Sequence, residues 1–160
     1  MSRANELRKR LVEAALEWER YFGVAPSITS AISELDAAQL VGMKERDYCA
    51  EGQNRTAVTK DADFTVKTSP ADVGIRYQVT ANRPSGKKGS AVTLVKQKTE
   101  KRRPFGWDRL IWILYDRSYE IREAREFTVG QYRTNFGLAN RLSPDDMRKG
   151  RPMSLLTDWK

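Results

Sequence analysis

Side chains that could hold a hard metal ion are spaced along the first half of the chain, at Glu34, at Asp61 and Asp63, and at Gln78. Oxygen ligands are those that Mg²⁺ and Mn²⁺ prefer, and Mg²⁺ usually keeps several of its waters when few protein groups bind it. A metal held in this way lowers the pKa of a bound water and stabilises the leaving oxygen of a phosphodiester. These residue types therefore indicate metal-dependent phosphoryl chemistry, although acids on strand faces and helix flanks are also common on proteins that carry out no reaction.

The composition of the 160-residue chain excludes most other catalytic chemistries. It contains no histidine and one cysteine, Cys49. Neither a Ser-His-Asp triad nor a Cys-His pair can form, and one thiol makes no zinc site and no intramolecular disulfide. Gly86-Lys87-Lys88 lacks the spacing of a phosphate-binding P-loop. Carboxylates, lysine, hydroxyls and a bound metal ion remain as the groups that could carry out a reaction.

Positive charge is concentrated in one segment of the chain. Between Arg83 and Arg103 there are eight basic residues and one acid, Glu100, in a chain whose net charge is +8. Contact with phosphates gains from the release of counterions, so such a segment favours a nucleic-acid partner over a merely solvated loop. The residues expected to contact the nucleic acid are Arg83, Lys87, Lys88, Lys96, Lys98, Lys101, Arg102 and Arg103.

Two amphipathic helices are expected before the first strand. The first covers Asn5–Phe22, and the second covers Ile28–Val41 with Glu34 at the edge of its apolar arc. Residues 43–60 are polar and irregular, which predicts a loop or short turns. The apolar face expected for the first helix consists of Leu7, Leu11, Ala15, Trp18 and Phe22.

The candidate metal ligands are placed by two strands, 61–67 and 75–82, in which apolar and polar residues alternate. In the second strand Ile75, Tyr77, Val79 and Ala81 are expected to be buried. If the two strands pair as a hairpin with their apolar faces aligned, Asp63 comes near Gln78 and Asp61 near Thr80. The polar rows of both strands would then share one surface.

The remaining elements complete an α+β fold, with N-terminal helices packed on a central mixed sheet. We expect strands at 91–96, 110–115 and 119–127, the second of them apolar enough to be buried on both faces. Helices are expected at 129–136 and after Ser143, followed by a loose basic tail. One domain, 1–160, would contain an N-terminal helix (1–23), a core (24–136) and a C-terminal helix and tail (137–160). No run of residues is apolar enough to span a membrane and no signal region is present, which predicts a cytoplasmic protein.

Four short stretches follow one another along the chain: Ser33-Glu34-Leu35, Asp61-Ala62-Asp63-Phe64, 76–83 and 108–116. In this order they resemble the restriction-endonuclease-like superfamily of PD-(D/E)xK nucleases, in a small bacterial variant with a Gln-x-Lys motif. The resemblance covers about residues 24–136 and implies a nuclease core with Asp63 as principal metal ligand. It implies that Glu34 is the helix carboxylate, that Asp61 is an alternative ligand, and that Gln78 replaces the second strand acid. It also implies Mg²⁺ or Mn²⁺ as cofactor, double-stranded DNA as partner, and a homodimer whose interface the sequence does not identify.

One departure from the family pattern concerns its catalytic lysine, in whose place this sequence has Thr80. A threonine hydroxyl carries no positive charge and cannot balance charge on a phosphate. Lys96 or Lys88 could reach the site instead, the metal alone could support slow cleavage, or the protein could bind DNA without cutting it. The resemblance therefore implies either a Mg²⁺-dependent deoxyribonuclease with Glu34, Asp63, Gln78 and Thr80 at the catalytic positions, or a non-catalytic nucleic-acid-binding module on a degenerate nuclease fold.

Overall fold

A mixed five-stranded sheet forms the centre of the protein, in a computed structural model that describes residues 1–55, 62–84, 95–96, 105–137, 139 and 141–155. The strand order is β1-β2-β4-β5-β7, with β2 parallel to β4 and the other neighbours antiparallel, and β3 pairs separately with β6. The α+β class with a mixed sheet is thus confirmed. The strands are β1 (Phe64–Val66), β2 (Ile75–Asn82), β3 (Val95–Lys96), β4 (Arg109–Tyr115), β5 (Ile121–Thr128), β6 (Arg141–Leu142) and β7 (Arg151–Pro152).

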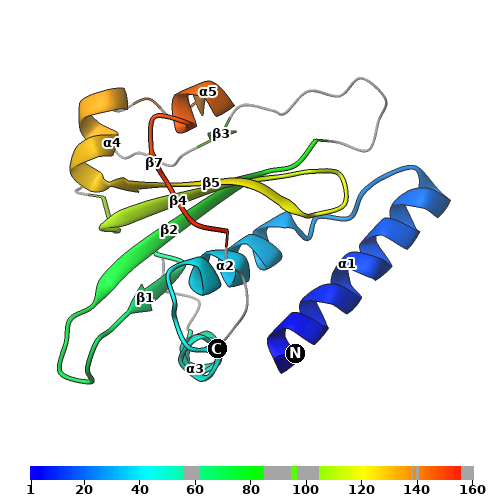
Figure 1. Cartoon of the computed structure of the whole chain (residues 1–160), viewed down its shortest axis with the longest axis horizontal. Helices are drawn as coiled ribbons and strands as arrows, with labels where there is room; N and C mark the ends of the chain where they lie inside the picture. Colours follow the sequence, from blue (N-terminus) through cyan, green and yellow to red (C-terminus); the bar gives the residue numbers. More distant parts are fainter. Residues whose placement is uncertain (56–61, 85–94, 97–104, 138, 140, 156–160) are drawn as a thin grey trace.

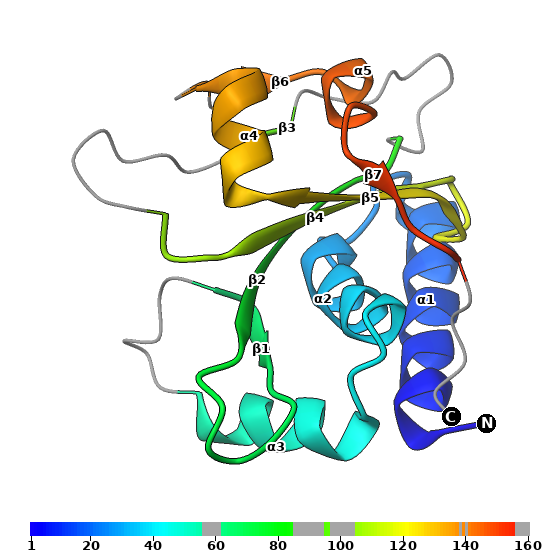
Figure 2. The ribbon, with the colours of Figure 1, turned by 60° about the vertical axis from the view of Figure 1, so that its left-hand side comes forward.

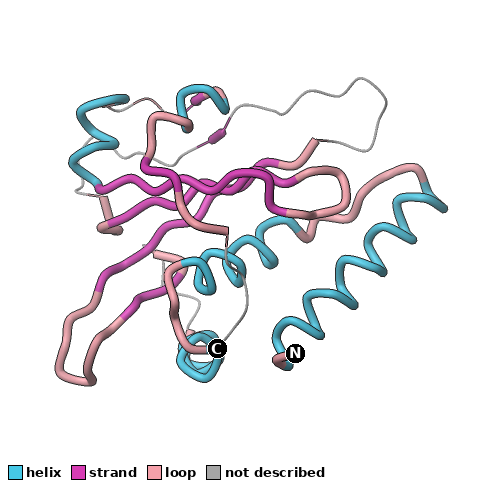
Figure 3. Tube along the Cα trace, in the orientation of Figure 1, coloured by secondary structure: helices cyan, strands magenta, loops and turns pink. Residues whose placement is uncertain are grey.

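Helices lie on both faces of this sheet (Figures 1 and 3). The N-terminal helices cover one face, with α2 against β2 and β4 and α3 against β1, while α4 and α5 lie on the other face (Figure 2). None of the helices among the described residues is long and apolar enough to cross a membrane. The helices are α1 (Arg3–Phe22), α2 (Thr29–Leu40), α3 (Glu45–Asn54), α4 (Val129–Phe136) and α5 (Pro144–Met147).

Strand β4 supplies both layers of the core, as its apolar sequence predicts. Ile111 and Ile113 face the core on the α1–α2 side, while Leu110 and Trp112 face the core on the α4–α5 side. All four side chains are fully buried. A strand buried on both faces has no polar row, so its sequence is a continuous apolar run instead of an alternating one.

Helix α1 buries a different face from the one predicted. Ala15 is buried as expected, but Leu7, Leu11, Trp18 and Phe22 are between 41% and 55% exposed. The buried face consists of small residues around Arg8, whose guanidinium binds the buried Asp36 of α2. The helix is therefore docked by an ion pair and small side chains, and hydrophobic periodicity does not detect such a contact.

Helix α3 falls in the segment predicted to be irregular, and that prediction is wrong. None of its residues is buried, so it has no apolar stripe from which a helix is recognised. Its contacts are polar: the Glu45 carboxylate accepts from the Ala4 backbone N–H at 2.8 Å, and the Glu51 carboxylate accepts from the Thr65 N–H at 2.8 and 3.0 Å. These bonds place α3 beside the start of α1 and the edge strand β1.

The predicted hairpin and its register are confirmed in the described residues. Phe64 pairs with Tyr77, and the Asp63 backbone N–H donates to the Tyr77 carbonyl at 2.8 Å. The predicted burial pattern of β2 is only partly correct. Ile75 is 39% exposed, because it pairs with Val66 of β1 but lies beyond the first pair between β2 and β4, Tyr77 with Arg109. The buried Asn82 accepts a hydrogen bond from Trp112 Nε1 at 2.8 Å.

The C-terminal part follows the prediction more closely up to residue 150. Ser143 and Asp146 cap α5 reciprocally, and α4 has the predicted bounds. Strand β5 begins two residues later than predicted because Tyr119 adopts a left-handed φ of 62° in the preceding turn. The start of the tail is not loose, since β7 pairs with β5. Of the strand expected at 91–96, only residues 95 and 96 are among those described.

Candidate functional site

Asp63 and Gln78 are in direct contact, as the hairpin register predicts. The side-chain amide of Gln78 donates to Asp63 Oδ2 at 2.8 Å, and the backbone N–H of Val79 donates to the same oxygen at 2.6 Å. Asp63 immediately precedes β1, and both side chains are half-buried. Because both bonds reach one oxygen, Oδ1 has no hydrogen-bond donor among the residues that the structure describes.

Glu34, on α2, is paired with an arginine that the sequence did not single out. Arg55 Nη1 lies 3.0 Å from Glu34 Oε2, and the two side chains are 33% and 20% exposed. Burial lowers the pKa of Arg55, but the hydrogen bond to Glu34 and the charge of Glu34 raise it by more. The pKa of Arg55 is therefore raised above its ordinary value. Arg55 directly follows α3, and only the position of that helix brings it to Glu34.

The charge of Glu34 acts on both Asp63 and Tyr48, which indicates that these side chains lie near one another. Burial and the nearby charge of Glu34 raise the pKa of Asp63 to about 6, against the opposing effects of the Val79 N–H and Arg55. Burial, together with the charges of Glu34 and Asp63, raises the pKa of the Tyr48 phenol to about 12. We call Glu34, Tyr48, Arg55, Asp63 and Gln78 the carboxylate cluster.

The carboxylate cluster contains two carboxylates, Glu34 and Asp63, which is fewer than a metal site built from protein groups alone would need. No three His, Cys, Asp or Glu side chains of the described residues converge on one point. Two ionised carboxylates that lie close together repel each other, and a divalent cation bound to both relieves that repulsion. Mg²⁺ commonly binds through one or two carboxylates and retained waters. Asp63 and Glu34 are thus the described residues that could hold Mg²⁺ or Mn²⁺, with Glu34 already paired with Arg55, while Asp61 lies outside the described residues.

The structure places the remaining predicted catalytic position, Thr80, on β2 opposite Trp112 of β4, where it is half-buried. Gln78 and Thr80 are two positions apart along the strand, so both side chains project from the same side of the sheet. Lys96 lies in β3, which pairs with β6 outside the main sheet. Lys88 lies outside the described residues. In the part of the chain that is described, Arg55 is thus the cation found beside the two carboxylates.

Arg83 does not occupy the exposed position predicted for a phosphate contact. Its side chain is 6% exposed, forms a 2.7 Å ion pair with Glu19 of α1, and donates to the Arg117 carbonyl. Its guanidinium also lies 4.0 Å from the centre of the Tyr119 ring. Arg83 therefore ties α1 to β2 and to the β4–β5 turn. The other basic positions of the predicted nucleic-acid contact lie outside the described residues, apart from the backbone of Lys96.

Two members of the carboxylate cluster, Tyr48 and Arg55, were missed from the sequence. Both depend on α3: Tyr48 lies within it and stacks edge-on against Phe64 of β1 with ring centroids 6.3 Å apart. The only local signal for this helix is acid in its first turn, at Glu45 and Asp47, which favours a helix N-terminus by complementing the helix dipole. An arginine soon after such a start is too common to indicate a site.

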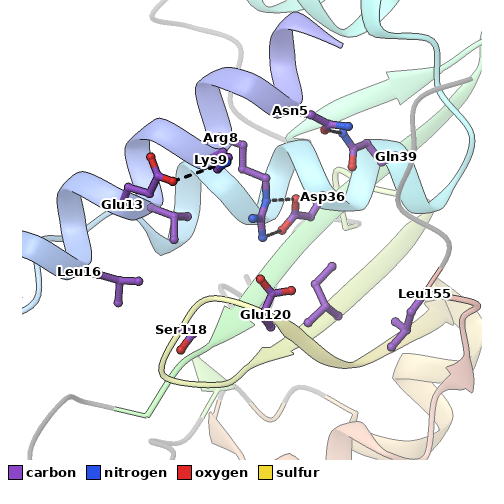
Figure 4. A pocket seen from close by; sticks show the side chains of 12 residues that line it. Asn5, Arg8, Lys9, Glu13, Leu16, Asp36, Gln39, Ser118, Glu120 and Leu155 are labelled. Atoms are coloured by element: carbon purple, nitrogen blue, oxygen red, sulfur yellow. Dashed lines mark hydrogen bonds and ion pairs between the residues drawn. The ribbon is translucent and has the colours of Figure 1, made fainter. Parts of the chain in front are cut away.

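A separate cavity of about 540 Å³ lies between α1, α2 and the β4–β5 turn (Figure 4). Asp36 and Gln39 of α2 line it, and Asp36 faces away from Glu34 because residues two apart lie on opposite sides of a helix. Four of its five charged lining residues are paired, Arg8 with Asp36 and Lys9 with Glu13, and the fifth is Glu120. This cavity therefore presents the contacts that hold α1 in place, and it is not continuous with the carboxylate cluster.

The fold and the carboxylate cluster together define an α+β protein with a half-buried pair of carboxylates at the hairpin edge of a mixed sheet. The chain matches no model of a known protein family and no curated protein. Any function assigned to it must therefore come from the chemistry of its own residues.

We expect Asp63→Asn to stabilise the protein at neutral pH. A carboxyl whose pKa rises from 3.8 to about 6 on folding contributes stability that is full below pH 4 and is lost as the pH rises through 6. Asparagine does not titrate, and its side-chain oxygen can accept the same two bonds. The free energy of unfolding at pH 7.5, measured by urea denaturation, should increase by about 2 kcal/mol, with no increase at pH 4.

Asp72→Asn is the matched control for this prediction. Asp72 lies in the β1–β2 turn, where bonds from the Gly74 and Thr68 N–H groups lower the pKa of its exposed carboxyl. Its replacement should destabilise the protein at neutral pH, which is the opposite sign. Equal stabilities of wild type and Asp63→Asn at both pH values would contradict the raised pKa of Asp63.

Proposed function

We propose that the protein binds DNA and cleaves its phosphodiester bonds in a metal-dependent reaction at the carboxylate cluster. The observation that supports this function is the meeting of Glu34, Asp63 and Gln78 from α2, the start of β1 and β2. The 2.8 Å bond from Gln78 to Asp63 and the effect of the Glu34 charge on the Asp63 pKa support the assignment of all three residues to one site. A half-buried carboxylate whose pKa is raised by burial and by a neighbouring charge, as that of Asp63 is, is typical of functional sites.

Each residue of the cluster has a role that its chemistry allows. Asp63 and Glu34 would hold the metal, and Gln78 would orient Asp63 through its amide. When bound, the metal would supply a water of lowered pKa and positive charge near the leaving oxygen. Arg55 can balance charge on a phosphate, as the absent lysine would, but its raised pKa prevents it from acting as a base.

A DNA partner is supported by charge. The chain carries a net charge of +8, and most of this excess lies between residues 83 and 103. Phosphate contacts from such a segment would depend steeply on salt, since each contact releases counterions. With Arg83 held by Glu19, the residues available for this role are Lys87, Lys88, Lys96, Lys98, Lys101, Arg102 and Arg103.

A second function, DNA binding without cleavage, is favoured by one specific contact. Arg55 already neutralises Glu34 at 3.0 Å, so a metal must compete with an internal ion pair for one of its two carboxylates. Gln78 also contributes no negative charge where an acid would strengthen metal binding. In this case the carboxylate cluster has no catalytic role, and DNA binding is independent of divalent ions.

Plasmid nicking tests the proposed function. Wild type should nick supercoiled plasmid in Mg²⁺ or Mn²⁺ and not in EDTA, and Asp63→Ala should lower the rate by at least about 100-fold, because the metal loses its principal ligand. Asp72→Ala, which removes an exposed carboxylate of the same hairpin, should keep the wild-type rate.

The outcomes separate the two functions. Full activity of Asp63→Ala would overturn the assignment of the site. Salt-dependent DNA binding without nicking, unchanged by EDTA, would support the non-catalytic module. Failure to bind any DNA at low salt would overturn both functions.

A further inference from the structure

Helix α1 carries a row of large apolar side chains that the other described residues of the chain leave exposed. Leu7, Leu11, Trp18 and Tyr21 are 47%, 41%, 52% and 83% exposed. The ring of Phe22 lies 4.4 Å from that of Trp18 and 4.9 Å from that of Tyr21, measured between centroids. A contiguous apolar patch of this kind marks an interaction surface, whereas single exposed apolar residues do not.

The spacing of this row is that of a helix pair. Leu7, Leu11, Ala14, Trp18 and Tyr21 alternate steps of four and three residues, which is the 3.5-residue repeat of a seam between two helices. The chain's own contacts use a neighbouring face, on which Ala4, Val12 and Ala15 are buried. Helix α1 lies at the edge of the fold, with the sheet to one side of it (Figures 1 and 2).

The charges beside the seam indicate that its partner is an identical helix in the antiparallel direction. Arg10 lies between Leu7 and Leu11, and Glu17 lies between Ala14 and Trp18. Neither has an ion-pair partner among the described residues. Antiparallel packing that sets Leu7 opposite the partner's Trp18 also brings Arg10 beside the partner's Glu17, twice by symmetry. A parallel pair would place Arg10 opposite the partner's Ala15, which is buried against its own chain.

We propose that α1 is the interface of an antiparallel homodimer, with Leu7, Leu11, Ala14, Trp18 and Tyr21 as its seam. The Ser2 cap, the Arg8–Asp36 pair and the Arg83–Glu19 pair hold α1 in place within each copy. The helix therefore loses little conformational freedom when two copies associate, which favours binding. The dimer does not depend on the carboxylate cluster, so its test is independent of the proposed function.

Charge reversal tests the antiparallel arrangement. Arg10→Glu and Glu17→Arg each set like charges side by side at both ends of the interface. Each should weaken the dimer about 10-fold, and the double variant should return to within about 3-fold of wild type. The dissociation constant is measured by sedimentation equilibrium on the full chain. Both residues are exposed, so the variants should fold, and circular dichroism checks this.

A second pair of variants tests the apolar seam. Trp18→Lys should leave the protein monomeric, whereas Val73→Lys, at an 87% exposed apolar residue of the β1–β2 turn, should dimerise as wild type does. A wild type that stays monomeric at the highest concentration reached would overturn the proposal. So would a dimer that Trp18→Lys leaves intact, or a double reversal weaker than either single one.

Discussion

Replacement of Thr80 by lysine is expected to raise metal-dependent nicking of plasmid DNA by about 100-fold over wild type, the order of effect that one positioned catalytic group supplies. Thr80 is half-buried on β2, on the same side of the sheet as Gln78. Lysine is long enough to bring its ammonium group toward the carboxylate cluster, where Asp63 and Glu34 would favour its charged form. It would orient the attacking water and balance charge on the phosphate, which a hydroxyl cannot do.

The control for this experiment is Ile75→Lys, which adds the same charge to the exposed end of the same strand. It should bind DNA slightly more tightly without faster cleavage. Each protein is assayed with Mn²⁺ and with EDTA. If Ile75→Lys and Thr80→Lys increase nicking equally, the gain is a general effect of charge on DNA binding. An unchanged rate in Thr80→Lys would contradict the assignment of position 80 to the family's lysine.

The part of the site that could be predicted from sequence depends on one short-range rule. Side chains alternate along a strand, and a one-residue slip would turn the buried Phe64 toward solvent. Burial of Phe64 against Tyr77 therefore determines the register, and the register brings Asp63 to Gln78. Glu34 was also predicted at the flank of its helix, where it is found.

What could not be predicted are contacts made by polar groups across long stretches of chain. Arg83 pairs with Glu19, 64 residues earlier, and Arg55 pairs with Glu34. The local sequence around an arginine does not show whether its side chain is held in an ion pair or is free to bind phosphate. The same limit applies to the apolar face predicted for α1, since periodicity shows that a face is apolar but not whether its own chain covers it.

Asp36→Ala is expected to cause the largest loss of stability. Asp36 is 1% exposed, and its carboxylate accepts from Arg8 Nε at 2.6 Å, Arg8 Nη2 at 2.8 Å and the Tyr115 hydroxyl at 2.6 Å. Burial and then the charge of Asp36 raise the pKa of Tyr115, so the phenol remains a donor. Removal of the carboxylate leaves a largely buried guanidinium without a counter-charge, which costs about 3–5 kcal/mol of the free energy of unfolding.

Urea denaturation measures this loss as a lower midpoint with an unchanged slope. Glu13→Ala is the matched control, since Glu13 forms an exposed 3.8 Å pair with Lys9 on α1, the helix that carries Arg8. It should cost less than about 1 kcal/mol. A loss in Asp36→Ala no larger than that would contradict the role of the pair. The double variant Arg8→Met/Asp36→Leu should be more stable than Asp36→Ala, because two apolar side chains leave no buried charge. The cost of Asp36→Ala would then arise from the unpaired guanidinium, and not from the attraction between the two groups.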